Sequence, residues 1–348
     1  MKGFGLGTYA LSAGIAVALL AGCGGSQPPI GATGTAATSS QVPRGGEHFV
    51  EALFYAFGGS DGKMAIFNVN FRAWPKLRKL VSIPYVHLYG ACSDPSGHVF
   101  VTQHGTSGSG EVIEFAHGGT SAVATLSDSG MASACAYDRL TGNLAVANSY
   151  DADAPGGPGP DIAVYTDETG MPTLYADPLS DSIRSCSYDL SGNLFIGGVR
   201  RHGHFVLTEL PRGRSAVKAI TIDGGIGAEY RSEDVQWHHG SLFITSVDHH
   251  RDHSTHVFVL NINGSTATVK GTIKLRTVNA NEKATGPWTV LFGVYAVTVD
   301  RIGVAAWRIP LDCTGTCVVR RRDRHLLRIA DGFVSVAASA IRPRERKL

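Results

Sequence analysis

A short β-type phrase recurs along the chain and constrains the fold more than any other feature. It joins a small apolar run, a turn centred on glycine, and a second run of β-branched and aromatic residues. Its copies lie at residues 91–101, 134–146, 185–198 and 234–244. The turn glycines Gly97, Gly142, Gly192 and Gly240 are separated by 45, 50 and 48 residues. A period of this length accommodates a four-stranded antiparallel sheet and is typical of a propeller blade.

Each turn glycine follows Ser, Thr or His, as in a turn that needs a positive φ. After each phrase come a polar loop and a further short strand, at residues 111–115, 162–165, 205–210 and 257–261. A Gly-containing turn and a fourth strand then complete the period. We therefore predict an all-β fold of four-stranded antiparallel blades over residues 47–342. Six blades fit best, with five or seven as alternatives.

The first and last blades are the least regular. The first has apolar runs at 52–56 and 64–69 and an outer strand near 77–83, but no innermost strand. Residues 332–339 are a candidate for that strand, and pairing them with the first blade would close the ring and remove exposed edges. For the last blade, strands are predicted at residues 288–292, 294–299, 303–309 and 317–320.

The N-terminal segment has the pattern of a secretory signal. Lys2 is its one early charge, and the apolar run 9–20 is shorter than the about 20 residues that span a bilayer. The run ends in Leu-Leu-Ala-Gly before Cys23, which resembles the lipobox of bacterial lipoproteins. The resemblance implies cleavage after residue 22 and acylation of Cys23. An ordinary signal peptide followed by a chance cysteine is the alternative.

Residues 24–46 are rich in Gly, Ser, Thr, Ala, Gln and Pro, a composition that favours a flexible tether. The predicted organisation is a signal peptide (1–22), an acylated cysteine and linker (23–46), a propeller (47–342) and a basic tail (343–348). The 31 basic and 29 acidic residues are nearly balanced, which gives no case for nucleic acid. The expected location is the extracytoplasmic side of a bacterial cell envelope. The sequence does not decide which membrane carries the anchor.

The turn-and-strand phrase resembles the six-bladed propellers of the NHL-repeat and gluconolactonase-like group over about residues 47–342. Gluconolactonase-like members hold a divalent metal at the mouth of the channel with Glu, Asn and Asp side chains. Glu51, Asn148 and Asp248 fall in the corresponding regions, but none sits in a motif that carries the ligand assignment over. This departure counts against lactonase activity.

The cysteines fall into two groups. Cys92, Cys135 and Cys186 occupy equivalent places on three predicted first strands, where a small apolar residue packs well. A soft-metal site is the alternative, although neighbouring blades are expected to hold these thiols too far apart. Cys313 and Cys317 flank a Gly-centred turn, and we predict a disulfide between them in an exported protein. Without Cys23 five cysteines remain, so at least one thiol stays unpaired within the chain.

Other polar clusters suggest metals only weakly. One predicted loop contains His249, His250, His253 and His256, and His238 and His239 are near it in the sequence. The loop is either a zinc, copper or nickel site or a solvated hairpin. Asp151, Asp153 and Asp161 could ligate calcium, but their surroundings are rich in Pro and Gly. The arginines at 320–324 and 342–346 are expected to be solvated ends, with lipid headgroups as the alternative partner. We predict no cofactor.

The sequence is compatible with three functions. The first is a membrane-anchored binding module for a protein, a glycan or a small ligand, with a monomeric domain and no catalysis. The second is a metal-dependent lactonase or esterase with Glu, Asn and Asp converging at the channel mouth. The third is a structural component of an envelope complex.

Overall fold

The structure is a computed structural model that describes residues 51–341 except 59–61, 71–72, 106–108, 150–158, 169, 201–202, 225, 227–229, 249–253, 276–288, 293–294, 301–302, 320–323 and 329–332. The chain divides into two compact units, Met1–Gly46 and Glu47–Leu348, and every described residue belongs to the second. The described residues form strands, with one 3₁₀ helix among them, η1 (Thr166–Glu168). None of their helices has the length and apolar character needed to cross a bilayer.

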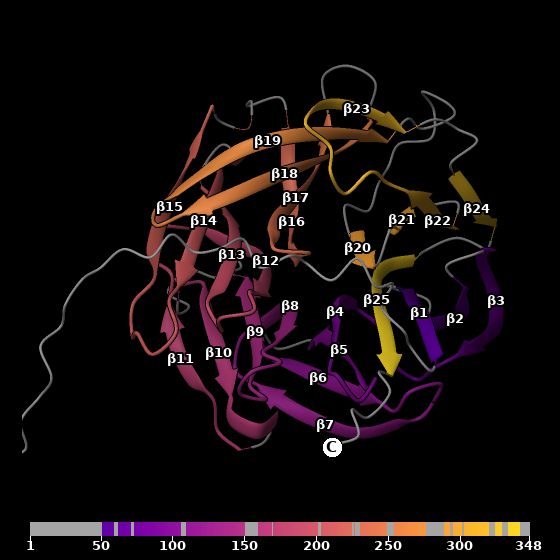
Figure 1. The fold of residues 1–348 in the computed structure, drawn as a ribbon. Helices are drawn as coiled ribbons and strands as arrows, with labels where there is room; N and C mark the ends of the chain where they lie inside the picture. Colours follow the sequence, from indigo (N-terminus) through magenta and orange to yellow (C-terminus); the bar gives the residue numbers. More distant parts are fainter. Residues whose placement is uncertain are drawn as a thin grey trace, which may run out of the picture. The chain divides into compact units, whose positions relative to one another are not determined.

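Four separate sheets each have four antiparallel strands (Figure 1). The first consists of β25 (Phe333–Ile341), β1 (Glu51–Gly58), β2 (Lys63–Asn70) and β3 (Ala73–Ser82). The second consists of β4 (Leu88–Ser93), β5 (Val99–His104), β6 (Gly110–Phe115) and β7 (Ala122–Asp128). The third consists of β8 (Met131–Tyr137), β9 (Leu144–Ser149), β10 (Asp161–Tyr165) and β11 (Thr173–Ala176). The fourth consists of β20 (Thr289–Phe292), β21 (Tyr295–Asp300), β22 (Gly303–Arg308) and β24 (Arg324–Arg328).

The remaining strands form one nine-stranded sheet. It contains the antiparallel run β12 (Ser182–Tyr188), β13 (Leu194–Val199), β14 (Phe205–Leu210), β15 (Lys218–Asp223) and the run β16 (Tyr230–His238), β17 (Ser241–Asp248), β18 (Thr255–Asn263), β19 (Thr266–Leu275). The outer strands β15 and β19 pair in parallel through Thr221, Ile222 and Asp223, which fuses the two runs. The predicted count of six separate blades is therefore wrong, because the structure has four.

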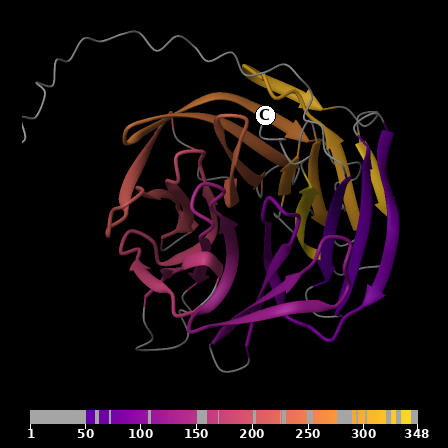
Figure 2. The ribbon, with the colours of Figure 1, turned by 60° about the horizontal axis from the view of Figure 1, so that its bottom comes forward.

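The sheets follow one another around the second unit in chain order (Figure 2). The first strands β25, β4, β8, β12, β16 and β20 contact their neighbours in a closed cycle. The closure predicted from the C-terminal run is confirmed, since β25 pairs antiparallel with β1 from Glu51 opposite Ile341 to Gly58 opposite Phe333. The arrangement is that of a β-propeller, in which pairing between the two ends of the chain removes an exposed edge.

Apolar side chains of the middle strands fill the spaces between adjacent sheets. Phe54, Ala65 and Phe67 pack towards β21 and β22, whereas Tyr55 and Ile66 pack towards the second sheet. Successive residues of a strand point to opposite faces, so β1 and β2 contribute to two cores at once. This explains why these strands read as continuous apolar runs and not as alternating ones.

The repeated phrase forms as predicted. Gly97, Gly142, Gly192 and Gly240 all have positive φ, between 76° and 93°. In three copies an aspartate closes the turn: Asp94 Oδ1 accepts from the backbone N–H of His98, Asp138 Oδ1 from that of Leu140, and Asp189 Oδ1 from that of Ser191. An Asp that caps its own turn together with a glycine that supplies positive φ is a local code for a tight hairpin.

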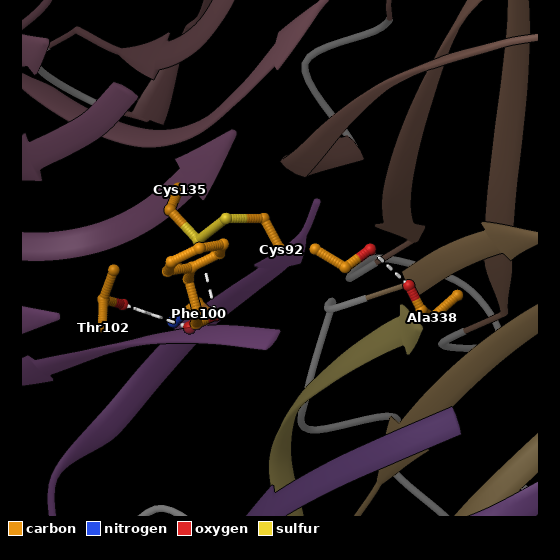
Figure 3. The surroundings of a disulfide bond; sticks show 7 residues. Cys92, Phe100, Thr102, Cys135 and Ala338 are labelled. Carbon is orange, nitrogen blue, oxygen red and sulfur yellow. Dashed lines mark hydrogen bonds between the residues drawn. A yellow bond between two sulfur atoms is a disulfide. The ribbon is translucent and has the colours of Figure 1, made fainter. Parts of the chain in front are cut away.

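The first strands of the second and third sheets approach closely, and a disulfide joins them. Cys92 on β4 and Cys135 on β8 are bonded, with their Cα atoms 5.6 Å apart (Figure 3). The expectation that the first-strand cysteines lie too far apart to interact is wrong for this pair. Gly90 explains the proximity, since a Cβ on it would lie 2.4 Å from the Cα of Ala134. Cys186, at the equivalent place on β12, is a buried free thiol.

The sheet that includes β20 differs from its predicted form. Residues 315–319 form β23 (Gly315–Val319), but this strand pairs in parallel with β19 of the nine-stranded sheet. The fourth strand is instead β24, for which no strand was predicted. Gly271 permits this pairing, because a Cβ on it would lie 2.4 Å from the carbonyl oxygen of Cys313.

Candidate functional site

Two shielded polar atoms lie where the second strands of adjacent sheets end. His104 is the last residue of β5, and Asn148 is the last but one of β9. The Nε2 atom of His104 and the Oδ1 atom of Asn148 are shielded from solvent and have no hydrogen-bond partner in the described part of the chain. Both residues meet at Ala132, whose backbone is hydrogen-bonded to His104 and which is the cross-strand partner of Asn148. Shielded polar atoms without partners cost stability, so they mark a place where a ligand could complete the bonding.

Further polar contacts lie beside Asn148 in the third sheet and at the end of β7 in the second. Its side-chain Nδ2 donates to Asp161 Oδ1 at 2.9 Å. The hydroxyl of Tyr165 donates to Asp128 Oδ2 at 2.7 Å and lies 3.0 Å from the carbonyl oxygen of Ser127. Asp128 also accepts at Oδ1 from the backbone N–H of Gly130, at 2.8 Å. The bond to Asp161 thus fixes the amide of Asn148, so its free oxygen is held in one direction.

Burial changes the acidity of two of these groups. Burial raises the pKa of the Asp161 carboxyl, the nearby charge of Asp128 raises it further, and the amide of Asn148 acts in the opposite direction. Burial also raises the pKa of Tyr165, and its bond to Asp128 adds to the effect. The Tyr165 hydroxyl therefore stays protonated and serves as a fixed donor.

His104 has the most altered imidazole among the described residues with a resolved shift. Burial lowers its pKa to about 4, and the neighbouring His87 lowers it as well. Its ring stacks on Tyr89, with centroids 3.6 Å apart. His104 is therefore neutral at pH 7, and its shielded Nε2 can serve as a hydrogen-bond partner without carrying charge.

This low pKa predicts a measurable contribution of His104 to acid sensitivity. The folded-state value, about 4, lies below the ordinary 6.5, so the unfolded chain binds a proton that the folded chain does not. Stability should fall as pH drops from about 6.5 to about 4. Urea unfolding at pH 7 and pH 4.5 measures how far the free energy of unfolding falls between the two pH values. This fall should be smaller in His104→Gln than in the unsubstituted protein by on the order of 1 kcal/mol, a figure reduced because the ring is partly exposed.

The exposed His204 provides the matched control for this prediction. His204→Gln should leave the difference between the two pH values unchanged. Equal acid sensitivity in His104→Gln and in the unsubstituted protein would show that the imidazole of His104 titrates normally.

The sequence-predicted metal ligands lie partly outside the described residues. His249, His250 and His253, with Asp151 and Asp153, lie outside the described residues. His256 is buried on β18, with its Nε2 2.8 Å from the Ser254 hydroxyl, and Asp161 accepts from the amide of Asn148. Across the described ranges, no group of three or more His, Cys, Asp or Glu side chains is placed to hold a metal ion.

Asn148 and Asp248, which were considered for the gluconolactonase-like metal position, have different hydrogen-bond partners in the structure. Asn148 bonds to Asp161, and Asp248 is buried at the end of β17, where its backbone N–H donates to the Ser254 carbonyl at 3.0 Å. The side chain of Glu51 lies outside the described part, as does Cys23. Asn148 was predicted only as a possible metal ligand, and no sequence pattern indicated His104. A polar residue at the end of an otherwise apolar second strand was the available signal.

The remaining cysteines form a second disulfide and a buried thiol. Cys313 and Cys317 are bonded across the Gly315 turn, where the sequence analysis expected a disulfide, with Cα atoms 6.1 Å apart. Burial raises the pKa of the Cys186 thiol well above its usual range, with the carboxyl of Asp234 adding to the effect. A thiol held protonated in this way is a poor nucleophile and a poor metal ligand, so Cys186 is a packing residue.

Comparison with solved structures shows the fold. A Bacteroides fragilis protein proposed to be a 6-phosphogluconolactonase superposes with a TM-score of 0.53 at 9% identity, over 83% of this chain and 98% of its own. A Bacteroides uniformis protein with the same proposed activity has a TM-score of 0.51 at 10% identity, over 83% and 99%. TolB from Acinetobacter baumannii has a TM-score of 0.51 at 11% identity, over 83% of this chain and 66% of that one. No protein-family model and no curated protein matches the sequence.

Proposed function

We propose that this chain is a lipid-anchored, extracytoplasmic propeller that binds a small polar ligand beside His104 and Asn148. The shielded Nε2 and Oδ1 atoms without hydrogen-bond partners carry the proposal. A ligand with a donor for Asn148 and a complementary group for His104 would satisfy both atoms. Sites of this kind combine a few fixed polar groups with apolar walls, and here Ala132 and Tyr89 adjoin the two polar residues.

Two features support an extracytoplasmic location. The sequence of residues 1–23 has the signal and lipobox pattern, with Cys23 as the acylated residue. The two disulfides, Cys92–Cys135 and Cys313–Cys317, are of the kind that persists in oxidising compartments. Membership of the NHL-repeat and gluconolactonase-like group belongs to the same proposal and is supported by the turn phrase and the propeller fold.

The alternative is a metal-dependent lactonase or esterase. It is favoured by two solved structures that share this fold, both proposed to be 6-phosphogluconolactonases. It requires a divalent metal, for which Asn148 and Asp161 offer oxygen ligands side by side. Elemental mass spectrometry of the purified protein, before and after chelation, separates the two functions. A stoichiometric divalent metal that supports lactone or ester hydrolysis would establish the enzyme.

The binding function is tested by thermal unfolding with a panel of sugars, sugar acids, amino acids and short peptides. A ligand present at 100 times its Kd stabilises the folded state by about 2.7 kcal/mol, so a binder should raise the Tm by several degrees. The shift should disappear in Asn148→Ala and in His104→Phe but persist in the control His204→Phe. A shift of equal size in Asn148→Ala, His104→Phe and the unsubstituted protein would place binding elsewhere and overturn the proposed site.

A further inference from the structure

One end of the sheets carries both the entry of the chain and a group of exposed apolar turns. We call it the turn end and define it by the turns at 94–98, 138–143 and 189–193, which join first strands to second strands. The ring of Phe100 stacks on Tyr137 with centroids 6.1 Å apart, so the first two turns are neighbours. A Cβ on Gly192 would lie 3.2 Å from Asp138 Oδ2, so the second and third are neighbours too.

Three large apolar side chains project from this end. Leu140 and Leu190 lie in the second and third turns and are 52% and 75% exposed. Met171 is 93% exposed. It follows β10, whose last residue pairs with Leu144 directly after the second turn, so Met171 lies at the same end. Apolar side chains so exposed at the tips of neighbouring turns indicate contact with another apolar phase.

Local hydrogen bonds occupy the acidic side chains of the two turns that carry the leucines. Asp138 accepts from the N–H of Leu140 and from the Thr141 hydroxyl, at 2.9 and 2.5 Å. Asp189 accepts from the N–H of Ser191 and from both the N–H and the Nδ2 of Asn193, each at 2.8 Å. The carboxylates are thereby occupied within their own turns, and the residues at the tips are leucines.

Basic side chains lie in or beside two of these turns. Arg139, Arg212 and Arg214 are exposed. A Cβ on Gly192 would lie 3.1 Å from the Cδ of Arg212, which places that side chain beside the Leu190 turn. Apolar residues flanked by arginines match the interface of a bilayer, where acyl chains lie beneath anionic headgroups.

Both ends of the folded unit point the same way. The Ser93 hydroxyl, at the start of the first turn, donates to the carbonyl of Ala338 near the end of β25 (Figure 3). Glu51 pairs with Ile341 further along the same strand, so β1 begins and β25 ends at the turn end. β1 is the first described strand after Cys23, so the described residues begin at this end. The sequence after Ile341 reads Arg-Pro-Arg-Glu-Arg-Lys-Leu, with four basic residues and one acidic residue.

We infer that the turn end docks on the anionic membrane surface, with Leu140, Met171 and Leu190 inserted among the lipid headgroups. This inference rests on the proposed lipid anchor at Cys23, which would bring the domain to the bilayer. The linker between Cys23 and β1 spans 27 residues, enough for about 90 Å when extended, so the anchor alone leaves the orientation open. The turn end sets the orientation, and the ends of the second strands, with His104 and Asn148, then face away from the membrane.

The test is co-sedimentation of the chain from residue 23, carrying Cys23→Ser, with phosphatidylcholine vesicles that contain none or one third of phosphatidylglycerol. Binding should require phosphatidylglycerol and weaken with added salt, because screened arginines lose their attraction for the surface. The triple variant Leu140→Ser/Met171→Ser/Leu190→Ser should bind at least tenfold more weakly. The control is Leu77→Ser/Leu80→Ser/Val318→Ser, three exposed apolar residues away from the turn end, and this variant should bind as the parent does.

Tryptophan quenching supplies an independent readout. Leu190→Trp should be quenched by brominated lipid in anionic vesicles, whereas Leu77→Trp should not. Absence of vesicle binding by the parent chain, or equal binding by the parent and the turn-end triple variant, would overturn the inference and leave a protein partner as the occupant of the tips. Mass spectrometry of the intact protein for acylation of Cys23 tests the anchor separately. If the natural chain is acylated but its Cys23→Ser form does not bind vesicles, the lipid anchor is confirmed and the docking surface is contradicted.

Discussion

Replacing Cys92 and Cys135 together by serine is expected to lower the free energy of unfolding by about 4 kcal/mol. The disulfide closes a loop of 43 residues, and a cross-link of that span removes much of the conformational freedom of the unfolded chain. It also joins the first strands of two separate sheets, which backbone hydrogen bonds do not connect. Urea unfolding of the double variant, with and without reductant, measures the effect.

The second disulfide provides an internal comparison. Cys313 and Cys317 are only 4 residues apart, so the same relation gives about 2 kcal/mol for Cys313→Ser/Cys317→Ser. The Cys92/Cys135 pair should therefore have the larger effect, and reductant should have no further effect on a variant that lacks both disulfides. Equal losses for the two pairs would show that loop closure does not govern their contribution.

Gly90→Ala is expected to destabilise the protein by about 3 kcal/mol or more. The added methyl would lie 2.4 Å from the Cα of Ala134 and 2.6 Å from the carbonyl oxygen of Ser133. Both obstacles are backbone atoms of β8, so relief requires the two first strands to separate against the Cys92–Cys135 disulfide. Thermal unfolding should show a Tm lower by at least several degrees.

Two other glycines calibrate this result. Gly159→Ala meets nothing within 4 Å and should be nearly neutral. Gly213→Ala also has open space but a φ of +70°, and should cost about 1 kcal/mol from backbone strain alone. If Gly90→Ala were no worse than Gly213→Ala, the close approach of β4 and β8 would be contradicted.

The repeat predicted the local units well because hairpins are encoded locally. A turn glycine with a polar neighbour and β-branched flanks is sufficient to specify a hairpin, and all four turn glycines have the predicted positive φ. The closing strand could also be predicted, since an apolar run without a partner at each end of the chain leaves few alternatives. These features depend on sequence neighbours or on a simple count of strands.

Contacts between sheets were predicted less well. Nothing in the turn phrase states how closely two first strands approach, so the Cys92–Cys135 disulfide was missed, although the small residues Gly90 and Ala134 were a signal of close packing. The pairing of β23 with β19 was missed for a similar reason, because it depends on Gly271 facing Gly315 in register. Likewise, His104 and Asn148 come together only through Ala132, which no spacing rule relates to both.

The pairing of β25 with β1 has a consequence for how the protein is made. A chain synthesised from its N-terminus delivers β1 first and β25 last, with 274 residues between them. At about 5–20 residues per second, the inner edge of β1 waits roughly 15 to 60 s for its partner. During that interval the edge of β1 exposes unpaired backbone groups to other nascent chains. Side chains that are buried in the folded protein, such as Phe54, are exposed as well. The last step of biosynthesis, not the first, therefore ends the period of aggregation risk, and a chain that terminates before Phe333 never leaves it.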